Sequence, residues 1–256
     1  MFRRISGPVA VASAGALVAG LLATGVFALV TDTVQINGGQ VTSADYLDPG
    51  DSPLDLQIGP ATSLTSCAGV TYETDDVISF SDATIVGTEV DLTPLIEGTP
   101  VASKILAVYC IRNATGGEYG GALSVTLLSR SSAEIGACNV TELAAETALG
   151  AATCGAGDAG ELQNVIDIGV ALGSPECAGS GPGPTARFAA ADAPGTTKPI
   201  DVAADPGVAI QLADGGECLL FVQALFSQTA STDELKAAVT DRIDFDLAIN
   251  LVDPAA

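Results

Sequence analysis

The sequence contains no histidine and no tryptophan, and only 9 of its 256 residues are lysine or arginine. Without an imidazole, the chain cannot build the His-Glu-x-x-His zinc site of a metallopeptidase. A Ser-His-Asp triad is excluded for the same reason, because no imidazole can accept the serine proton. Glycine-rich loops of the kind that bind phosphates are also missing. We therefore expect no enzyme, and a catalytic pair of carboxylates is the enzymatic alternative that these residue types leave open.

The scarcity of basic residues leaves a large excess of negative charge. Aspartate and glutamate number 31, so the formal net charge is −22. A surface of this sign repels phosphate backbones and anionic lipid headgroups, and we expect no nucleic acid partner. Only 16% of the residues are charged while 48% are apolar, which is far more apolar content than disordered acidic tails carry. The chain can therefore bury a substantial core.

The first thirty residues have the pattern of an export signal. Arg3 and Arg4 precede an uncharged apolar run over residues 7–30, near the end of which Val26-Phe27-Ala28 provides a cleavage site. We expect a signal peptidase to cleave between Ala28 and Leu29, so that residues 1–28 are a signal peptide and residues 29–256 form one secreted domain. The alternative is an uncleaved anchor, because the run is long enough to cross a bilayer. In that case the membrane is contacted only through residues 1–30.

The six cysteines favour structural disulfides. No Cys-x-x-Cys pair occurs and the chain has the features of an exported protein, where disulfides persist. The candidate bridge residues are Cys67, Cys110, Cys138, Cys154, Cys177 and Cys218. We expect Cys138 to pair with Cys154, because these two bracket one short helical segment. The pairing of the other four stays open, and we expect them to tie strands and a long loop together.

Most of the chain is predicted to be β-strand. Residues 243–251 alternate between apolar and polar side chains, which is typical of a strand with one buried face. Residues 218–226 are apolar almost throughout, as expected for a central strand covered on both faces. Apolar and β-branched runs between turn residues predict further strands. These runs cover residues 54–58, 77–80, 83–86, 104–112 and 122–128.

Two short helices and one long loop interrupt the strands. Asn139 with Glu142, and Ser231 with Glu234, have the three-residue spacing of a capping box, and Gly150 provides a stop for the first helix. Residues 173–199 are rich in glycine and proline and predict a long surface loop. The fold class that follows is mostly β, a jelly-roll-like β-sandwich with short helical insertions, preceded by an N-terminal signal helix.

Carboxylates are the remaining candidates for a ligand site. Asp75 with Asp76, Asp48 with Asp51, and Asp244 with Asp246 are spaced closely enough to bind calcium, although none follows the EF-hand pattern. Calcium is the one cofactor that we consider, and an exported monomeric module that binds a ligand or calcium is one possible function. Asn113 and Asn139 also begin glycosylation sequons.

Several motifs, taken in order, resemble the TasA and camelysin family. They are the exit of the apolar run at residues 25–33, the segment Ser-Pro-Leu-Asp-Leu-Gln-Ile at 52–58, the strand that ends in Asn-Ala-Thr-Gly at 113–116, Gly-Gly-Glu at 215–217, and Ile-Asp-Phe-Asp-Leu at 243–247. The cysteines and the glycine- and proline-rich loop depart from the family pattern. Some members carry a metallopeptidase label, which this histidine-free chain does not support.

The resemblance implies a secreted structural subunit of an extracellular matrix fibre or cell-surface assembly. In TasA fibres the mature N-terminal segment adds as a strand to the neighbouring subunit, so the partners are copies of the chain itself. The matching segment here is residues 29–42, in which Val30, Val34, Ile36 and Val41 are the apolar residues of a candidate donor strand. The alternative is that this strand frays or pairs within its own chain.

Overall fold

The structure, a computed structural model, describes residues 31–36, 43–44, 54–73, 78, 80–87, 89–101, 103–116, 120–135, 137–150, 154–155, 158–173, 177, 185–202, 205–227 and 229–252. The expected signal peptide, the cleavage point between Ala28 and Leu29, and the donor-strand residues Val30 and Val41 lie outside them. The described elements belong to one compact unit, Val30–Pro254. None of the helices within the described ranges is long and apolar enough to span a bilayer.

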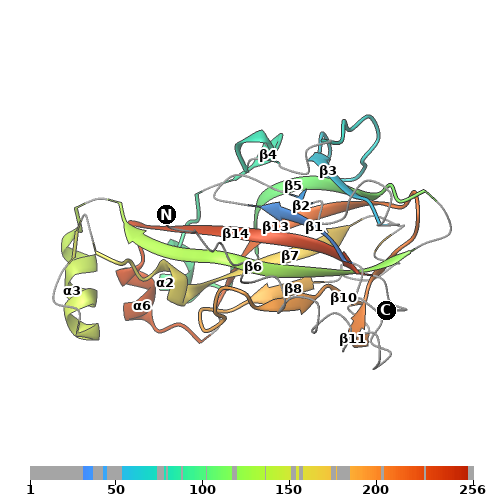
Figure 1. The fold of residues 1–256 in the computed structure, drawn as a ribbon. Helices are drawn as coiled ribbons and strands as arrows, with labels where there is room; N and C mark the ends of the chain where they lie inside the picture. The colour runs from blue at the N-terminus through green and yellow to red at the C-terminus, as the bar shows by residue number, and fades with distance from the viewer. Residues whose placement is uncertain are drawn as a thin grey trace, which may run out of the picture. The chain divides into compact units, whose positions relative to one another are not determined.

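The fold is mostly β, with two antiparallel sheets and few helices, as the strand-rich sequence predicts (Figure 1). The strands of the first sheet, in spatial order, are β12 (Gln211–Leu212), β6 (Gly121–Glu134), β14 (Asp241–Val252), β1 (Thr31–Ile36) and β2 (Ser43–Ala44), with β9 (Thr197–Pro199) also paired to β6. The strands of the second sheet are β11 (Asp205–Ala209), β10 (Asp201–Val202), β8 (Thr185–Phe188), β7 (Ile166–Gly173), β13 (Glu217–Phe226), β5 (Lys104–Asn113) and β3 (Leu56–Pro60), with β4 (Ile85–Val86) on β5.

The two sheets contribute to one hydrophobic core. Alternate residues of each strand face it, because successive side chains of a strand point to opposite sides of the sheet. From the first sheet come Leu123, Val125 and Leu127 of β6, and Leu247, Ile249 and Leu251 of β14. From the second come Ile168 and Val170 of β7, Leu220 and Val222 of β13, and Tyr109 and Ile111 of β5. Burial of these apolar side chains is the main stabilisation of the fold.

The strand β13 is central, as predicted from its continuous apolar run. It pairs with β5 on one side and β7 on the other. A second, smaller core cluster contains Ala61, Val108, Cys110 and Leu219. The disulfide between Cys67 and Cys110 joins the segment after β3 to β5, next to this cluster. Both faces of the central strands are thereby covered.

The first half of strand β14 is more exposed to solvent than the second half. Residues 241–246 alternate or are half-exposed, but Leu247 to Leu251 are all buried, including Ala248 and Asn250. The prediction of one apolar and one solvent-exposed face therefore holds only for the first half. The amide of Asn250 donates to Ser124 Oγ at 3.3 Å and Thr126 Oγ1 at 3.1 Å on β6. These bonds compensate the burial of a polar side chain.

The described helices are α2 (Thr93–Ile96), α3 (Val140–Leu149), α4 (Leu162–Val165), α6 (Thr232–Ala237) and the 3₁₀ turn η1 (Phe80–Asp82). Both capping boxes are confirmed, at Asn139 with Glu142 and at Ser231 with Glu234. Gly150 ends α3 with a left-handed φ of 87°, a conformation that glycine adopts without a steric penalty.

The prediction of one long loop over residues 173–199 is wrong. Two strands lie inside it: β8 pairs with β7, and β9 pairs with β6. The error arose because β8 is short and contains only two apolar residues, Ala186 and Phe188. Their burial depends on the neighbouring strand β7, which the sequence pattern did not reveal.

The prediction of a strand over residues 77–80 is also wrong, because Phe80 begins the 3₁₀ turn η1. The polar Ser81 and Asp82 follow it, and such residues favour turns over strands. The predicted strand at 83–86 shortens to β4.

Three disulfides are present. Cys138 pairs with Cys154, as predicted, and the open pairings resolve as Cys67 with Cys110 and Cys177 with Cys218. The last bridge fastens the region before β8 to the start of β13, which agrees with the expectation that the four other cysteines tie strands and the glycine- and proline-rich segment together. These bridges are consistent with an extracellular location.

Candidate functional site

The N-terminal strand β1 runs antiparallel to the C-terminal strand β14. The register places Thr31 opposite Val252, Val34 opposite Ile249, and Ile36 opposite Leu247. Of the predicted donor residues, Val34 and Ile36 therefore lie in β1, which pairs within its own chain. The other edge of β14 pairs with β6 over its whole length. The edge of residues 247–252 is thus covered by β1, and the short strand β2 pairs with the outer edge of β1.

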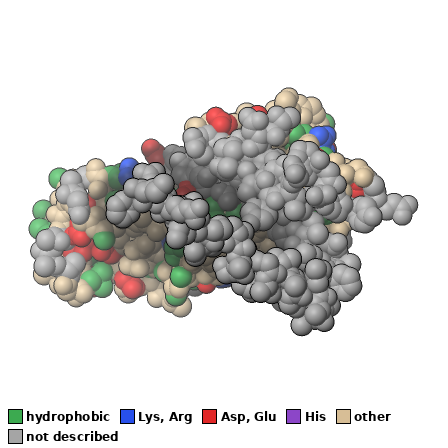
Figure 2. Space-filling model, in the orientation of Figure 1, with side chains coloured by type: hydrophobic (Ala, Val, Ile, Leu, Met, Phe, Trp, Pro, Cys, Tyr) green, Lys and Arg blue, Asp and Glu red, His purple; other side chains and the backbone are tan. Residues whose placement is uncertain are grey.

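The helix α3 is amphipathic, but in the reverse of the usual orientation: two charged side chains face the interior and two apolar side chains are exposed. Glu142 and Glu146 are 0% and 2% exposed, whereas Val140 and Leu143 are 86% and 52% exposed. Figure 2 shows hydrophobic side chains at the surface around α3. A surface helix normally turns its apolar side to the core and its charges to water. The inward carboxylates of α3 therefore require a specific environment.

Part of that environment is a set of hydrogen bonds around Thr240, just before β14. The backbone N–H of Thr240 donates to Glu142 Oε1 at 2.9 Å, and its hydroxyl lies 2.8 Å from the same oxygen. The hydroxyl also bonds to Glu134 at the end of β6. Asn139 N–H donates to the other oxygen of Glu142 at 3.1 Å. The carboxylate of Glu142 is thus satisfied, but one hydroxyl proton serves two carboxylates.

The other carboxylates of this group are less well satisfied. Asp241 Oδ2 accepts from the backbone N–H groups of Glu161 and Leu162, the latter at 2.9 Å. Asp241 Oδ1 and both oxygens of Glu146 are buried, and no N–H or hydroxyl group of the described residues donates to them. We call Glu134, Glu142, Glu146, Glu161 and Asp241 the acid cluster. Its members come from β6, α3, the turn before α4, and β14.

Burial and repulsion by neighbouring carboxylates raise the pKa values of two members of the acid cluster, Glu161 and Asp241. Burial, followed by a shared hydrogen bond with Glu146 and repulsion from it, raises the pKa of Glu161 to about 8. Burial also raises the pKa of Asp241 to about 6, against the opposing effect of its two backbone hydrogen bonds. The neighbouring charges that act on these two pKa values are all carboxylates.

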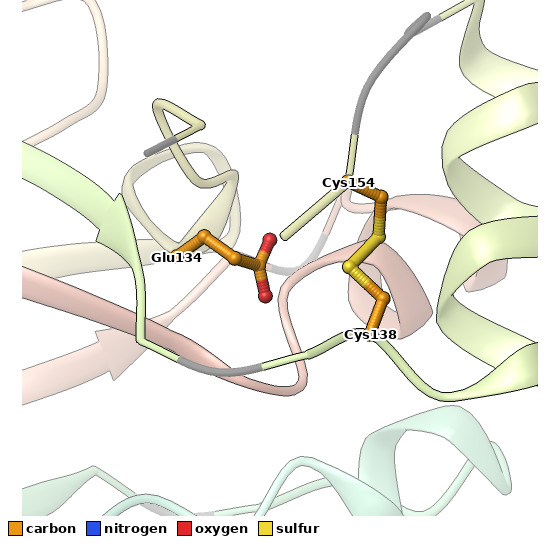
Figure 3. A group of neighbouring side chains, drawn as sticks. All are labelled: Glu134, Cys138 and Cys154. Atoms are coloured by element: carbon orange, nitrogen blue, oxygen red, sulfur yellow. A yellow bond between two sulfur atoms is a disulfide. The ribbon is translucent and has the colours of Figure 1, made fainter. Parts of the chain in front are cut away.

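The disulfide between Cys138 and Cys154 closes the acid cluster on one side. Figure 3 shows the carboxylate of Glu134 pointing toward the two sulfur atoms. In the described part of the chain, these three residues are the group whose potential metal-ligand atoms lie within 4.8 Å of one another. Both sulfur atoms are already bonded to each other, so they are not thiolate ligands for a metal. The bridge instead connects the two ends of the α3 segment.

The carboxylate pairs predicted from the sequence do not form this cluster. Asp244 makes an ion pair with Arg242 at 2.9 Å, and Asp246 accepts a hydrogen bond from Ser129. The other predicted pairs, Asp48 with Asp51 and Asp75 with Asp76, lie outside the described residues.

Sequence reasoning missed the acid cluster as a site. It identified Glu142 only as a member of a capping box. One signal was present, since Glu142 and Glu146 are four residues apart and must share a face of any helix there. Like charges at this spacing disfavour a helix unless something compensates them.

Asn113, the first residue of one sequon, is the last residue of β5 and lies in the core rather than on the surface. Asn113 is fully buried, and its amide nitrogen donates to the carbonyl of Leu212 at 3.0 Å. Its side-chain oxygen accepts from Thr115 N–H at 3.2 Å. A glycan on this nitrogen would break the bond to Leu212, so the structure argues against modification of the folded chain at Asn113.

Comparisons of the chain with protein-family models, curated proteins and solved structures gave no match.

Proposed function

We propose that this protein is a secreted structural subunit of an extracellular matrix fibre or cell-surface assembly, of the TasA and camelysin type, and that its copies associate by β-strand addition. In this proposal the two sheets form a jelly roll, residues 1–28 direct export, and a specialised signal peptidase releases the chain at Leu29. The three disulfides support export, because such bonds persist in oxidising compartments.

The observation that carries the proposal is the pairing of β1 with β14. Six consecutive positions, from Thr31 to Ile36, pair with Val252 to Leu247. If β1 left this place, the edge of β14 over residues 247–252 would be open, and an open edge of a long strand readily accepts another strand. Leu247, Ile249 and Leu251 are fully buried, so the strand segment whose edge would be open also contributes side chains to the core.

Exchange of β1 between copies would preserve its pairing. The incoming strand has the same sequence, so it makes the same register with β14 as the strand that it replaces. Domain swapping of an identical element therefore costs little free energy. Head-to-tail exchange that does not close into a ring gives a filament. The chain that is described here corresponds to the self-paired form of the subunit.

Electron microscopy of the exported protein tests the assembly itself. We expect regular fibres from the chain that begins at Leu29, and none from a chain that lacks residues 29–42. Monodisperse particles from both chains would contradict the proposal. Addition of a synthetic peptide of residues 29–42 to the truncated chain should give a stable 1:1 complex without fibres, because the peptide fills the β14 edge but carries no subunit.

Cysteine pairing between copies tests the strand exchange. Gln35 lies opposite Ala248 in the β1–β14 register. In a mixture of Gln35→Cys chains and Ala248→Cys chains, a disulfide between them forms only if β1 of one copy pairs with β14 of another. A mixture of Thr31→Cys and Ala248→Cys chains is the matched control, because Thr31 lies opposite Val252. Equal cross-linking in the two mixtures would argue against exchange in this register.

A second candidate function is an exported monomeric module that binds calcium or another ligand. The acid cluster favours it, because buried carboxylates without basic neighbours attract cations. A camelysin-type peptidase remains the least supported alternative, since the sequence has no histidine for its zinc site.

A further inference from the structure

The acid cluster contains buried oxygen atoms that the described chain leaves without a donor. Glu146 is 2% exposed, and neither of its oxygens accepts a hydrogen bond from an N–H or hydroxyl group of the described residues; the proton that it shares with Glu161 is its one described contact of this kind. Asp241, which like Glu146 raises the pKa of Glu161, has one such oxygen, Oδ1. A buried charged group without a partner is among the most destabilising features of a folded protein. Among the described side chains, only the proton shared with Glu161 compensates Glu146, and none compensates Asp241 Oδ1, so a cation that replaces this proton would be favoured here.

Basic side chains do not provide this compensation in the described part of the protein. Arg130 donates to three backbone carbonyls, those of Ala189, Gln163 and Ile166. Arg187 and Arg242 pair with Asp167 and Asp244. The charges that act on Glu161 and Asp241 are all negative. The acid cluster therefore concentrates carboxylates without a basic partner among the described residues.

We propose that the acid cluster is a calcium site, with Glu146, Glu161 and Asp241 as its carboxylate ligands and Glu134 next to them. Calcium takes six to eight oxygen ligands and accepts irregular geometry. Zinc is a poorer fit, because it prefers imidazole and thiolate ligands. The chain has no histidine, and Cys138 and Cys154 are joined in a disulfide.

The position of the cluster explains why α3 turns its glutamates inward. Glu146 lies on α3, Glu161 immediately before α4, and Asp241 at the start of β14. A cation bound by all three would connect the helical segment to the first sheet. The disulfide already holds the two ends of the α3 segment together, so the helix is a preformed cover over the ion. This site is independent of β1, and the inference does not rest on self-assembly.

The ligands are not fully gathered in the absence of the ion. Among the described residues, no three carboxylates have oxygens within 4.8 Å of one another. Ligand oxygens stand about 2.3–2.6 Å from a bound calcium ion. We therefore expect the long side chains of Glu146 and Glu161 to move inward on binding, while Asp241 stays fixed by its two backbone hydrogen bonds.

Calorimetric titration of the exported protein with calcium chloride tests the site. The protein keeps its three disulfides, is freed of metal with a chelator, and is studied near neutral pH as monomers. We expect one calcium ion per chain, with a Kd of roughly 10⁻³ M or tighter, the range of extracellular calcium modules. The Tm should rise with calcium concentration, because an ion that binds only the folded state stabilises it.

Two matched substitutions locate the binding. Glu146→Gln removes one ligand charge from the cluster and should weaken calcium binding by about tenfold or more. Glu97→Gln makes the same chemical change at an exposed residue after α2 and should leave the Kd within about twofold. Circular dichroism and the Tm in chelator establish that each variant is folded before its titration is read.

Three results would overturn the calcium site. The first is the absence of heat and of a Tm shift in the unaltered protein up to about 10 mM calcium, ten times the weakest affinity of such modules. The second is equal binding by the unaltered protein and Glu146→Gln. The third is equal loss of binding in Glu97→Gln, which would mean that calcium associates with the acidic surface as a whole.

Discussion

Glu142 and Thr240 are joined by two hydrogen bonds across 98 residues of sequence. Glu142 Oε1 accepts from the Thr240 backbone N–H at 2.9 Å and lies 2.8 Å from its hydroxyl. The second oxygen of Glu142 accepts from Asn139 N–H at 3.1 Å. One buried side chain therefore caps helix α3 and also holds it against the turn that precedes β14.

Replacement of this carboxylate by an amide should destabilise the protein. In Glu142→Gln, one of the two acceptors becomes an NH₂ group that faces the N–H of Asn139 or Thr240, and a buried donor is left unpaired. We expect the free energy of unfolding to fall by about 2 kcal/mol, as is typical for loss of a hydrogen bond to a buried charged group. Denaturant unfolding of the two proteins measures this difference.

The exposed Glu97 provides the control for that experiment. Glu97→Gln should change the free energy of unfolding by no more than about 0.5 kcal/mol, because surface substitutions away from specific contacts are nearly neutral. An unchanged denaturation midpoint in Glu142→Gln would mean that the bonds to Thr240 and Asn139 contribute no net stability.

The stability of the metal-free protein should fall as the pH rises. The ordinary pKa of a glutamate is 4.5, and burial with the nearby Glu146 raises that of Glu161 to about 8. The folded state therefore binds this proton more tightly than the unfolded state. Its stabilising contribution is complete below pH 4.5 and is lost as the pH passes through about 8. Asp241, with a pKa raised from 3.8 to about 6, acts in the same direction at lower pH.

Thermal unfolding in chelator across this range measures the pH effect. We expect the Tm to decrease from pH 5 toward pH 8, the interval between the ordinary and the raised pKa of Glu161. In Glu161→Gln the decrease should be smaller, because the neutral amide does not titrate. A Tm that stays constant or rises over the same interval in the unaltered protein would contradict the raised pKa values.

Removal of two of the disulfides should have unequal effects. Cys138 and Cys154 close a loop with a sequence separation of 16, against 43 for Cys67 and Cys110. The chain-entropy model gives contributions of about 3 and about 4 kcal/mol for loops of these sizes. Cys110 is also fully buried between packed strands. We expect the double alanine variant of Cys67 and Cys110 to be the less stable of the two in denaturant unfolding, and the reverse order would count against the entropic account.

Two glycines with similar backbone angles should respond differently to substitution. Gly98 and Gly160 have φ values of 77° and 67°, so alanine is strained at both. A Cβ at Gly98 would meet nothing within 4 Å, but one at Gly160 would lie 2.9 Å from the backbone of Ala133.

We therefore expect Gly98→Ala to cost about 1 kcal/mol, the strain of the left-handed conformation alone. Gly160→Ala should cost about 1–3 kcal/mol more, as overpacking of a tight site does. Chemical denaturation of both variants measures the difference. Equal losses would show that the backbone near Gly160 relaxes freely.

Local patterns predicted the elements that depend on neighbours in the sequence. The capping boxes at Asn139 and Ser231 need only residues three positions away, and both were correct. The apolar run of β13 was correctly read as a central strand. Cys138 and Cys154 were paired because they bracket one helix, and short loops leave few alternatives.

Elements that depend on distant strands escaped prediction. The strand β7 was not predicted, although its run from Ile166 to Gly173 is apolar and buried almost throughout. The short strand β8 was placed in a loop because Ala186 and Phe188 become buried only when β7 lies beside them. Such short segments have no strong periodicity of their own, so their structure is decided by pairing partners.

The sequence by itself determined the properties that sum over residues or repeat locally: the negative charge, the absence of imidazole chemistry, the β-rich fold and the helix caps. Only the tertiary structure decided that Glu142 and Glu146 face inward and meet Glu161 and Asp241. The physical reason is that whether a carboxylate is solvated or buried depends on which distant elements pack over it. That packing arises from the two sheets together, and no local pattern encodes it.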